Sequence, residues 1–478
     1  MAVMSENIQK SLESCLQQLN CHFTWNLVEG ENSLDDFEDR VFNQNVFQNC
    51  EFRATVCNLL AYIKHCRGQN ETALECLEQA EKFIQQDHGD KAEVRSLVTW
   101  GNYAWVYYHM GQFSEAQRYV DMVKKVCKKY SSPYRIESPE MDSEEGWTRL
   151  KCGAKHNEQA KVCFQKALER SPKNPEFFSG LAIASYRLDD RSPKENPIDP
   201  LRKAIELNGD NQYIKVLLAL QLLKMTSPSQ EEEEAARLVE EALEKAAPEA
   251  TDVLCSAAKF YRAKQSFDKA VELLTKALNH MPNNTHLHYH IASCYKMKID
   301  KVLKMEKSGI DREKEVSELI KKAVYHFKKA ESNEKLYRVG SSLMCLCVLS
   351  GQYEEAEHYF QNESSKELDP VSKQLLHLRW GNVQLYDMKC EDKAIHHYME
   401  GVRINRASGE REKLKTKLRN IAERRLFKNK KDAKALHILA FLQELNGKKQ
   451  QAREDADSAL GSESLLPSAS LDETKNEE

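Results

Sequence analysis

Cationic and aromatic side chains recur through the chain at spacings that could place them on one surface. They are Arg187, Tyr213, Lys259, Arg262, His286, Tyr289, Lys296, Arg338 and Arg379, with His290 adjacent. Guanidinium and ammonium groups attract phosphates, and flat side chains stack on nucleobases of any sequence. This combination is typical of surfaces that bind single-stranded nucleic acid. Each residue alone could equally be a solvated polar side chain, so the prediction depends on their joint occurrence.

A recurring pattern of small residues indicates which elements would position these side chains. Its clearest copy consists of Ala258, Tyr261, Ala270, Leu274, Ala277 and Pro282. Small residues let two antiparallel helices approach closely, and proline ends the second helix. Similar spacings recur along the chain with interruptions, and they match the 34-residue tetratricopeptide template. We therefore predict an all-α fold, a superhelical array of degenerate tetratricopeptide (helix-turn-helix) repeats with insertions.

Stacked repeats would leave the same face of each first helix on the inner, concave side of the array. The 3.6-residue periodicity places the cationic and aromatic residues on that face. Such repeats more often bind peptides, and a familiar version clamps a peptide carboxylate with Lys and Asn at fixed positions of the first helix. That combination is absent here, which argues against a carboxylate clamp and leaves other peptide-binding modes open.

Sequence signatures of catalysis are absent. The chain has no Walker loop, no Gly-rich dinucleotide turn, no His-Glu-x-x-His and no Gly-x-Ser-x-Gly, so we expect no enzymatic activity. His286, His290 and Cys294 share one helix face, but zinc ligands usually come from two elements, so we expect no metal and no other cofactor. The 14 cysteines form no Cys-x-x-Cys pair, which favours reduced thiols.

The composition is that of a folded protein, with 41% apolar and 30% charged residues among 478. No apolar stretch approaches the roughly 20 residues that span a bilayer, and the N-terminus lacks a signal-peptide pattern. We expect a cytoplasmic protein without membrane insertion.

The formal net charge of -4 conceals a basic block from Arg403 to Lys434, which holds 13 Lys or Arg and 4 acidic residues. The spacing of Leu414, Leu418 and Ile421 predicts an amphipathic helix with a cationic polar face. This face could be a solvated surface, a nuclear-import-like run or a phosphate-binding rim. The basic inner face of the repeats favours the phosphate-binding rim.

Several segments resemble the interferon-induced proteins with tetratricopeptide repeats. They include CHFTW at residues 21–25, SLVTWGNYAWVYYHMG at 96–111 and EEGWTRLKCG at 144–153. The resemblance covers nearly the whole chain. SSPYRIESPE at 131–140, KQLLHLRWGN at 373–382 and CEDKAIHHYMEGV at 390–402 are most similar to the branch of the family associated with AU-rich RNA.

The resemblance implies an interferon-induced, cytoplasmic antiviral effector that binds viral or AU-rich single-stranded RNA. It implies inhibition of viral gene expression and translation, and promotion of apoptosis. It further implies homodimers formed by helix exchange, hetero-oligomers with the first and third members of the family, and contact with translation initiation factor subunits.

The family's RNA contacts carry over to matching positions of this chain, and Trp147 matches the family's cap-stacking tryptophan. Those positions are Arg40, Lys151, Arg187, Tyr213, Lys259 and Arg262. Asn157 stands where cap-binding relatives carry tyrosine, Cys255 where arginine is usual, and Tyr289-His290 where His-Gln is found. These departures argue against recognition of a cap or a 5'-triphosphate.

Two functions remain open, and an enzymatic function is much less favoured than either. The first is a single-stranded RNA-binding effector. The second is a protein–protein scaffold that acts through translation factors and family partners, without direct RNA recognition. The predicted RNA-binding residues are Arg40, Lys151, Arg187, Tyr213, Lys259, Arg262, His290 and Lys296 in the repeats, and Lys413, Lys415, Lys417 and Arg419 in the basic block.

The expected organisation has four parts. They are an N-terminal helical cap (1–50), repeats that form the groove (51–298), C-terminal repeats with the basic helical insertion at 403–434 (299–460), and a disordered acidic tail (461–478).

Overall fold

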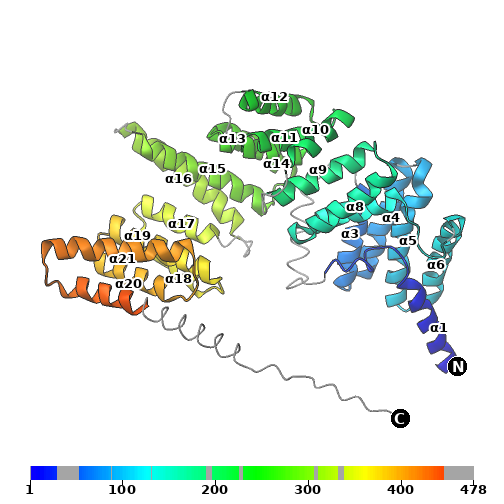
Figure 1. Ribbon diagram of the computed structural model, residues 1–478, viewed down its shortest axis with the longest axis horizontal. Coiled ribbons are helices and arrows are strands. Elements are labelled where there is room, and N and C mark those ends of the chain that lie inside the picture. Colours follow the sequence, from blue (N-terminus) through cyan, green and yellow to red (C-terminus); the bar gives the residue numbers. More distant parts are fainter. Residues whose placement is uncertain are drawn as a thin grey trace, which may run out of the picture. The chain divides into compact units, whose positions relative to one another are not determined.

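The computed structural model describes residues 2–28, 53–87, 89–130, 132–189, 196–224, 230–305, 310–331 and 338–445. Within these ranges every regular element is a helix (Figure 1). Contacts divide the chain into two compact units, unit 1 (1–330) and unit 2 (331–478). The prediction of an all-α fold is confirmed.

Unit 1 starts with α1 (Ala2–Leu16) and continues as a series of helical hairpins (Figure 1). The hairpins are α3 (Arg53–Cys66) with α4 (Asn70–Asp87), α5 (Ala92–His109) with α6 (Phe113–Cys127), α7 (Pro139–Cys152) with α8 (Asn157–Arg170), α9 (Pro175–Asp189) with α10 (Ile198–Leu207), α11 (Gln212–Leu222) with α12 (Gln230–Lys245), α13 (Thr251–Ala263) with α14 (Phe267–His280), and α15 (Thr285–Lys304) with α16 (Ile310–Ala330).

Small residues set the distance between the helices, as the sequence pattern predicts. Phe164 of α8 is fully buried and lies between Gly146 of α7 and Gly180 of α9. A Cβ atom added to Gly180 would lie 2.2 Å from Cε1 of Phe164, so only glycine leaves room for the ring. The Phe164 side chain of the α7–α8 hairpin therefore packs directly against the next hairpin, at Gly180 of α9.

The first helices of successive hairpins contact one another from α3 to α13, through α5, α7, α9 and α11. They form a continuous inner row, which carries five of the predicted RNA-binding residues, namely Lys151, Arg187, Tyr213, Lys259 and Arg262. N-terminal caps fix the ends of several helices beside it. Ser138 accepts a hydrogen bond from the Met141 amide at the start of α7, and Asn284 accepts one from the Leu287 amide at the start of α15.

Unit 2 is a second group of paired helices. It contains α17 (Arg338–Leu349), α18 (Tyr353–Ser365), α19 (Pro370–Asn382), a π-helical turn (Val383–Asp387), α20 (Glu391–Arg403), α21 (Gly409–Lys428) and helical residues 433–445. The helix predicted in the basic block is confirmed as α21, whose Leu414, Leu418 and Ile421 are buried.

The boundaries differ from the sequence expectation in two places. Residues 299–319, which interrupt the repeat spacing, lie largely within α15 and α16, so the array accommodates them by lengthening one hairpin. The predicted boundary at 298/299 falls inside α15, whereas the contacts divide the chain after Ala330. The tail at 461–478 and residues 29–50 of the predicted cap lie outside the described residues. None of the described helices is both long enough and apolar enough to cross a membrane.

Candidate functional site

Lys151, Arg187 and Tyr213 come together on the inner row, from α7, α9 and α11. Lys151 is buried at the C-terminal end of α7, and its charge interacts with that of Arg187. Arg187 Nη1 donates a hydrogen bond of 2.6 Å to the Leu150 carbonyl oxygen, which fixes the guanidinium beside Lys151. Burial raises the pKa of Tyr213, while the neighbouring Arg187 charge acts in the opposite direction. Three predicted residues thus form one cluster, the Lys151 cluster.

Two carboxylates accompany this cluster, so acidic groups share the face with the predicted cationic and aromatic residues. Glu144 of α7 accepts a hydrogen bond of 2.7 Å from the Thr55 hydroxyl of α3. Asp252 of α13 is 2% exposed, and its charge raises the pKa of Lys151. Buried cations cost free energy unless opposite charges accompany them, which explains why acidic residues share this face.

A half-buried ion pair adjoins Glu144. Arg95 Nη2 of α5 lies 2.8 Å from a carboxylate oxygen of Glu176 on α9, and the Ser143 hydroxyl donates to the other oxygen at 2.9 Å. The Arg95 charge also lowers the pKa of Glu144, although burial raises it more. One sequence signal could have revealed Glu144, because it precedes Lys151 by seven residues and so lies on the same face of α7.

Burial controls the ionisation of Lys151. Loss of hydration, reinforced by the Arg187 charge, lowers its pKa to about 7, against the opposing charges of Glu144 and Asp252. The amine is therefore close to half protonated at neutral pH. An arriving phosphate would favour the protonated form, because its negative charge would lie beside the ammonium.

Lys259, Arg262 and His290 form a second cluster on α13 and α15. Arg262 Nη1 lies 3.5 Å from His290 Nδ1, and with Cys255, Lys259 and Cys294 they line a small pocket. Its volume of about 10 Å³ suits a single water molecule and no larger ligand. Burial, assisted by the Arg262 and Lys259 charges, lowers the pKa of His290 to about 3. His290 is thus a neutral hydrogen-bonding group at this surface.

The remaining predicted residues of the repeats lie elsewhere. Lys296 is half-buried further along α15, and Arg379 of unit 2 donates a hydrogen bond of 2.7 Å to Ser341. Arg40 and the side chain of Arg338 lie outside the described residues. Trp147 is 6% exposed, and its ring packs edge-on against Phe164 with centroids 5.0 Å apart. Its indole therefore offers no open face for stacking in this structure.

The basic block is only partly available to a ligand. Lys415 is buried and lies 2.8 Å from Glu412, which contradicts its prediction as an exposed phosphate contact. Lys413 lies 3.8 Å from Glu410, and Lys417 donates a hydrogen bond of 2.8 Å to the Tyr386 hydroxyl. Arg419 is exposed.

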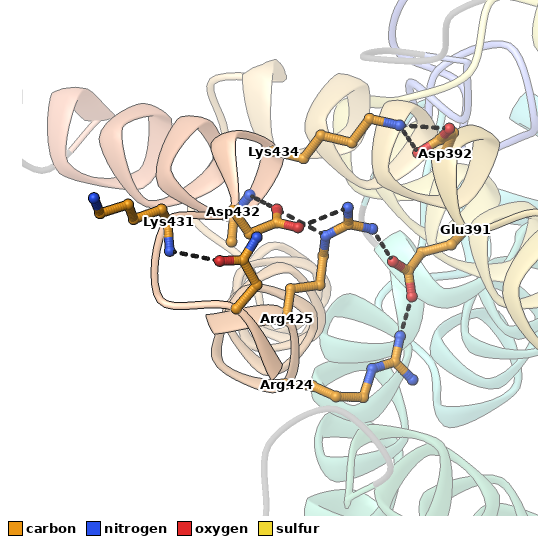
Figure 2. Close-up of polar contacts among 9 residues, drawn as sticks. Glu391, Asp392, Arg424, Arg425, Lys431, Asp432 and Lys434 are labelled. Carbon is orange, nitrogen blue, oxygen red and sulfur yellow. Dashed lines mark hydrogen bonds and ion pairs between the residues drawn. The ribbon is translucent and has the colours of Figure 1, made fainter. Parts of the chain in front are cut away.

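Further along the block, cationic side chains form ion pairs with acidic residues of unit 2, as Figure 2 shows. Arg425 Nη1 lies 2.6 Å from Glu391, and its Nε and Nη2 each donate 3.0 Å hydrogen bonds to Asp432. Lys434 lies 2.7 Å from both carboxylate oxygens of Asp392. The local excess of positive charge is thus used partly for folding, because acidic partners come from α20.

Metal ligands do not converge at either cluster. Across the described ranges, no group of three or more His, Cys, Asp or Glu residues could hold a metal ion. The residues on the inner row are instead hydrogen-bonding and ionic groups, which can bind a polyanion without a cofactor.

The chain is similar to known proteins over nearly its whole length. The family model "Tetratricopeptide repeat" matches residues 52–129. Interferon-induced protein with tetratricopeptide repeats 2 from Homo sapiens is 66% identical over 468 residues, which cover 98% of this chain and 99% of that protein. The protein of the same name from Mus musculus is 55% identical over 474 residues, with 98% and 99% covered.

Solved structures agree in fold. A monomeric mutant of IFIT1 with Gppp-AAAA is 40% identical with a TM-score of 0.75, covering 94% of this chain and 98% of that one. The human IFIT1 dimer with PPP-AAAA is 39% identical with a TM-score of 0.70, covering 94% and 99%. Identity at this level over nearly the whole length leaves one assignment, and the chain belongs to the family of interferon-induced proteins with tetratricopeptide repeats.

Proposed function

We propose that this protein is an interferon-induced antiviral effector that binds single-stranded RNA on the inner row of unit 1. The observation that carries the proposal is the run of Lys151, Arg187, Lys259 and Arg262 on first helices of the array, α7, α9 and α13. Support also comes from the relatives, because the IFIT1 structures contain Gppp-AAAA and PPP-AAAA.

The two clusters would play different parts in binding. Arg187 is positioned by the Leu150 carbonyl and has donors left for a phosphate, while Lys151 becomes fully charged when the phosphate arrives. Lys259 is exposed on α13 and would attract the phosphodiester chain by charge alone. Tyr213 would supply a flat surface for a base beside Arg187.

The biological role follows from the family. Viral or AU-rich RNA is the proposed ligand, held by the repeats of residues 51–298, and inhibition of viral translation or promotion of apoptosis is the proposed outcome in the cytoplasm. Homodimers, by helix exchange, and complexes with the first and third family members are the proposed assemblies. The human IFIT1 structure with PPP-AAAA is a dimer, which supports assembly as a family property.

Fluorescence anisotropy with a labelled AU-rich single-stranded RNA tests this function at several salt concentrations. We expect tight binding that falls steeply with log salt and is lost in the double variant Lys259→Glu with Arg262→Glu. The matched control is Lys269→Glu with Lys276→Glu, which reverses two exposed charges on α14, outside the inner row. An equal loss of RNA affinity in the control would show that the effect comes from the net charge of the protein and not from the inner row.

A wild-type protein that binds no RNA would overturn the proposal. The scaffold function would then take its place, with salt-insensitive binding of translation initiation factor subunits or family partners as its expected property.

A further inference from the structure

Two aromatic side chains of unit 2 are largely exposed. Phe427, in the last turn of α21, is 94% exposed, and Tyr386, in the π-helical turn between α19 and α20, is 51% exposed. A phenylalanine exposed to this degree contributes almost nothing to folding, because its apolar surface stays in water. Single exposed apolar residues are common, so the argument depends on what surrounds these two.

Lysine accompanies the ring of Tyr386. Lys417 Nζ lies 2.8 Å from the tyrosine hydroxyl and 4.9 Å from the ring centroid. The ammonium is therefore nearer the hydroxyl than the ring centre, and half of the tyrosine surface stays exposed. Only one of its three donors is used in this hydrogen bond, which leaves others for an anion.

Helical periodicity connects Lys417 to Phe427. Lys417, Arg424 and Phe427 recur at spacings of seven and three residues, so they lie along one side of α21, with Lys428 next to Phe427. The ten residues from Lys417 to Phe427 span about 15 Å, enough for a few nucleotides. We name this surface, formed by Tyr386, Lys417, Arg424, Phe427 and Lys428, the α21 ridge.

The ion-pair network holds the far end of the ridge in place (Figure 2). Arg425 bonds to Glu391 on α20 and to Asp432 after the helix, while Arg424 pairs with Glu391 as well. The last turn of α21 is thus fastened on two sides where Phe427 projects. A surface positioned before its ligand arrives loses less conformational entropy on binding.

We propose that the α21 ridge binds a few nucleotides of single-stranded RNA, with bases stacked on Phe427 and Tyr386 and phosphates held by Lys417 and Lys428. The proposal rests on the RNA-binding function and adds to the contacts predicted in the basic block a surface wholly within unit 2, with two named stacking residues. Stacking on an aromatic ring accepts any base, so the ridge adds affinity more than sequence preference.

The surroundings of Phe427 favour RNA over other partners. Lys428, Lys430 and Lys431 follow it and are all exposed, which complements a polyanion. A membrane-binding helix would expose several apolar residues, but the exposed residues of α21 that precede Phe427 are polar or charged, among them Arg419, Asn420, Glu423 and Arg424. A protein interface would likewise need a contiguous apolar patch.

Anisotropy titrations of the full chain with a labelled single-stranded RNA of about 20 nucleotides test the ridge. We expect Phe427→Ala to weaken binding by about tenfold, Phe427→Leu to weaken it similarly, and Phe427→Trp to retain it. Leucine keeps the apolar area but has no ring, so this comparison isolates stacking. Leu436→Ala removes an exposed apolar side chain outside the ridge and is expected to change nothing.

Photocrosslinking with a 5-bromouridine RNA, followed by mass spectrometry, locates the contact directly. Crosslinks at Phe427 or Tyr386 support the ridge. If wild type binds RNA, the three Phe427 variants bind equally well and crosslinks occur only in unit 1, the ridge is wrong and the RNA-binding function stands. Absence of RNA binding by wild type overturns both. Retention of RNA binding by Phe427→Leu, together with sedimentation of wild type on anionic phospholipid vesicles, would instead make Phe427 a membrane contact.

Discussion

Glu144 and Lys151 lie on the same face of α7, and each favours the charged form of the other. Lys151 lowers the pKa of Glu144, and Glu144 raises the pKa of Lys151. Burial has a larger effect than this mutual attraction. The net pKa shift therefore favours the neutral form of both residues. A ligand that brings negative charge to Lys151 therefore changes its protonation.

RNA affinity should depend on pH through Lys151. Its pKa is about 7 in the free protein, so RNA binding above pH 7 must take up a proton and becomes weaker as the pH rises. We expect the Kd to rise by at most about tenfold per pH unit above pH 7 and to level off below it. Anisotropy at constant ionic strength between about pH 6 and pH 8.5 measures this dependence.

Two variants identify the titrating group. Lys151→Met should bind RNA more weakly and lose the pH dependence, whereas Glu144→Gln should retain it. His290 stays neutral across this range, because its pKa is about 3. A wild-type Kd that does not change with pH would show that Lys151 does not contact RNA.

The hydrogen bond between Thr55 and Glu144 should stabilise unit 1. Thr55→Val keeps the shape of the side chain but removes the donor at 2.7 Å from the half-buried Glu144 carboxylate. We expect the free energy of unfolding to fall by about 1–3 kcal/mol in urea titrations. Thr416→Val is the control, because that threonine is exposed and its hydroxyl bonds only to a backbone carbonyl of its own helix. Equal losses in the two variants would contradict a special role for the buried pair.

Close packing at Gly180 should tolerate no side chain. Gly180→Ala would press a methyl group against the buried Phe164 ring, so we expect a loss of about 1–3 kcal/mol. Phe164→Leu in the same chain should recover part of it. The control is Gly209→Ala, where the added Cβ would meet only the Ile205 carbonyl at 3.8 Å. An unchanged Tm in Gly180→Ala would mean that the hairpins can separate at no cost.

Sequence periodicity predicts the helices well, and the inner row partly. Small residues such as Gly180 mark where helices touch, and periodicity places Arg187 and Lys259 on the inner side of the array. Lys151 is predicted from the resemblance alone. Periodicity does not say which residue of a neighbouring helix meets a given side chain, so Thr55 beside Glu144 and Asp252 near Lys151 emerge only from the fold.

The basic block shows why charge alone misleads. A count of charges between Arg403 and Lys434 predicts an open cationic face, but the acidic partners Glu391 and Asp392 precede the block and meet it through packing of α20 on α21. Lys415 is buried because its position on α21 faces the helices of unit 2. Such pairings depend on distant residues, which a local sequence pattern cannot reveal.

Arg425 should stabilise unit 2 more than the exposed Lys434 does. Arg425→Met removes three hydrogen bonds and leaves Glu391 paired with Arg424 alone and Asp432 with the Ala435 amide, so we expect the free energy of unfolding to fall. Lys434→Met removes an exposed ion pair with Asp392, which solvent screens, and should lower the free energy of unfolding less than Arg425→Met does. Hydrogen exchange of amides in α20 and α21 assigns the loss to unit 2. If the two variants lose the same protection, the network around Arg425 is no more than a surface ion pair, and it does not hold Phe427 in place.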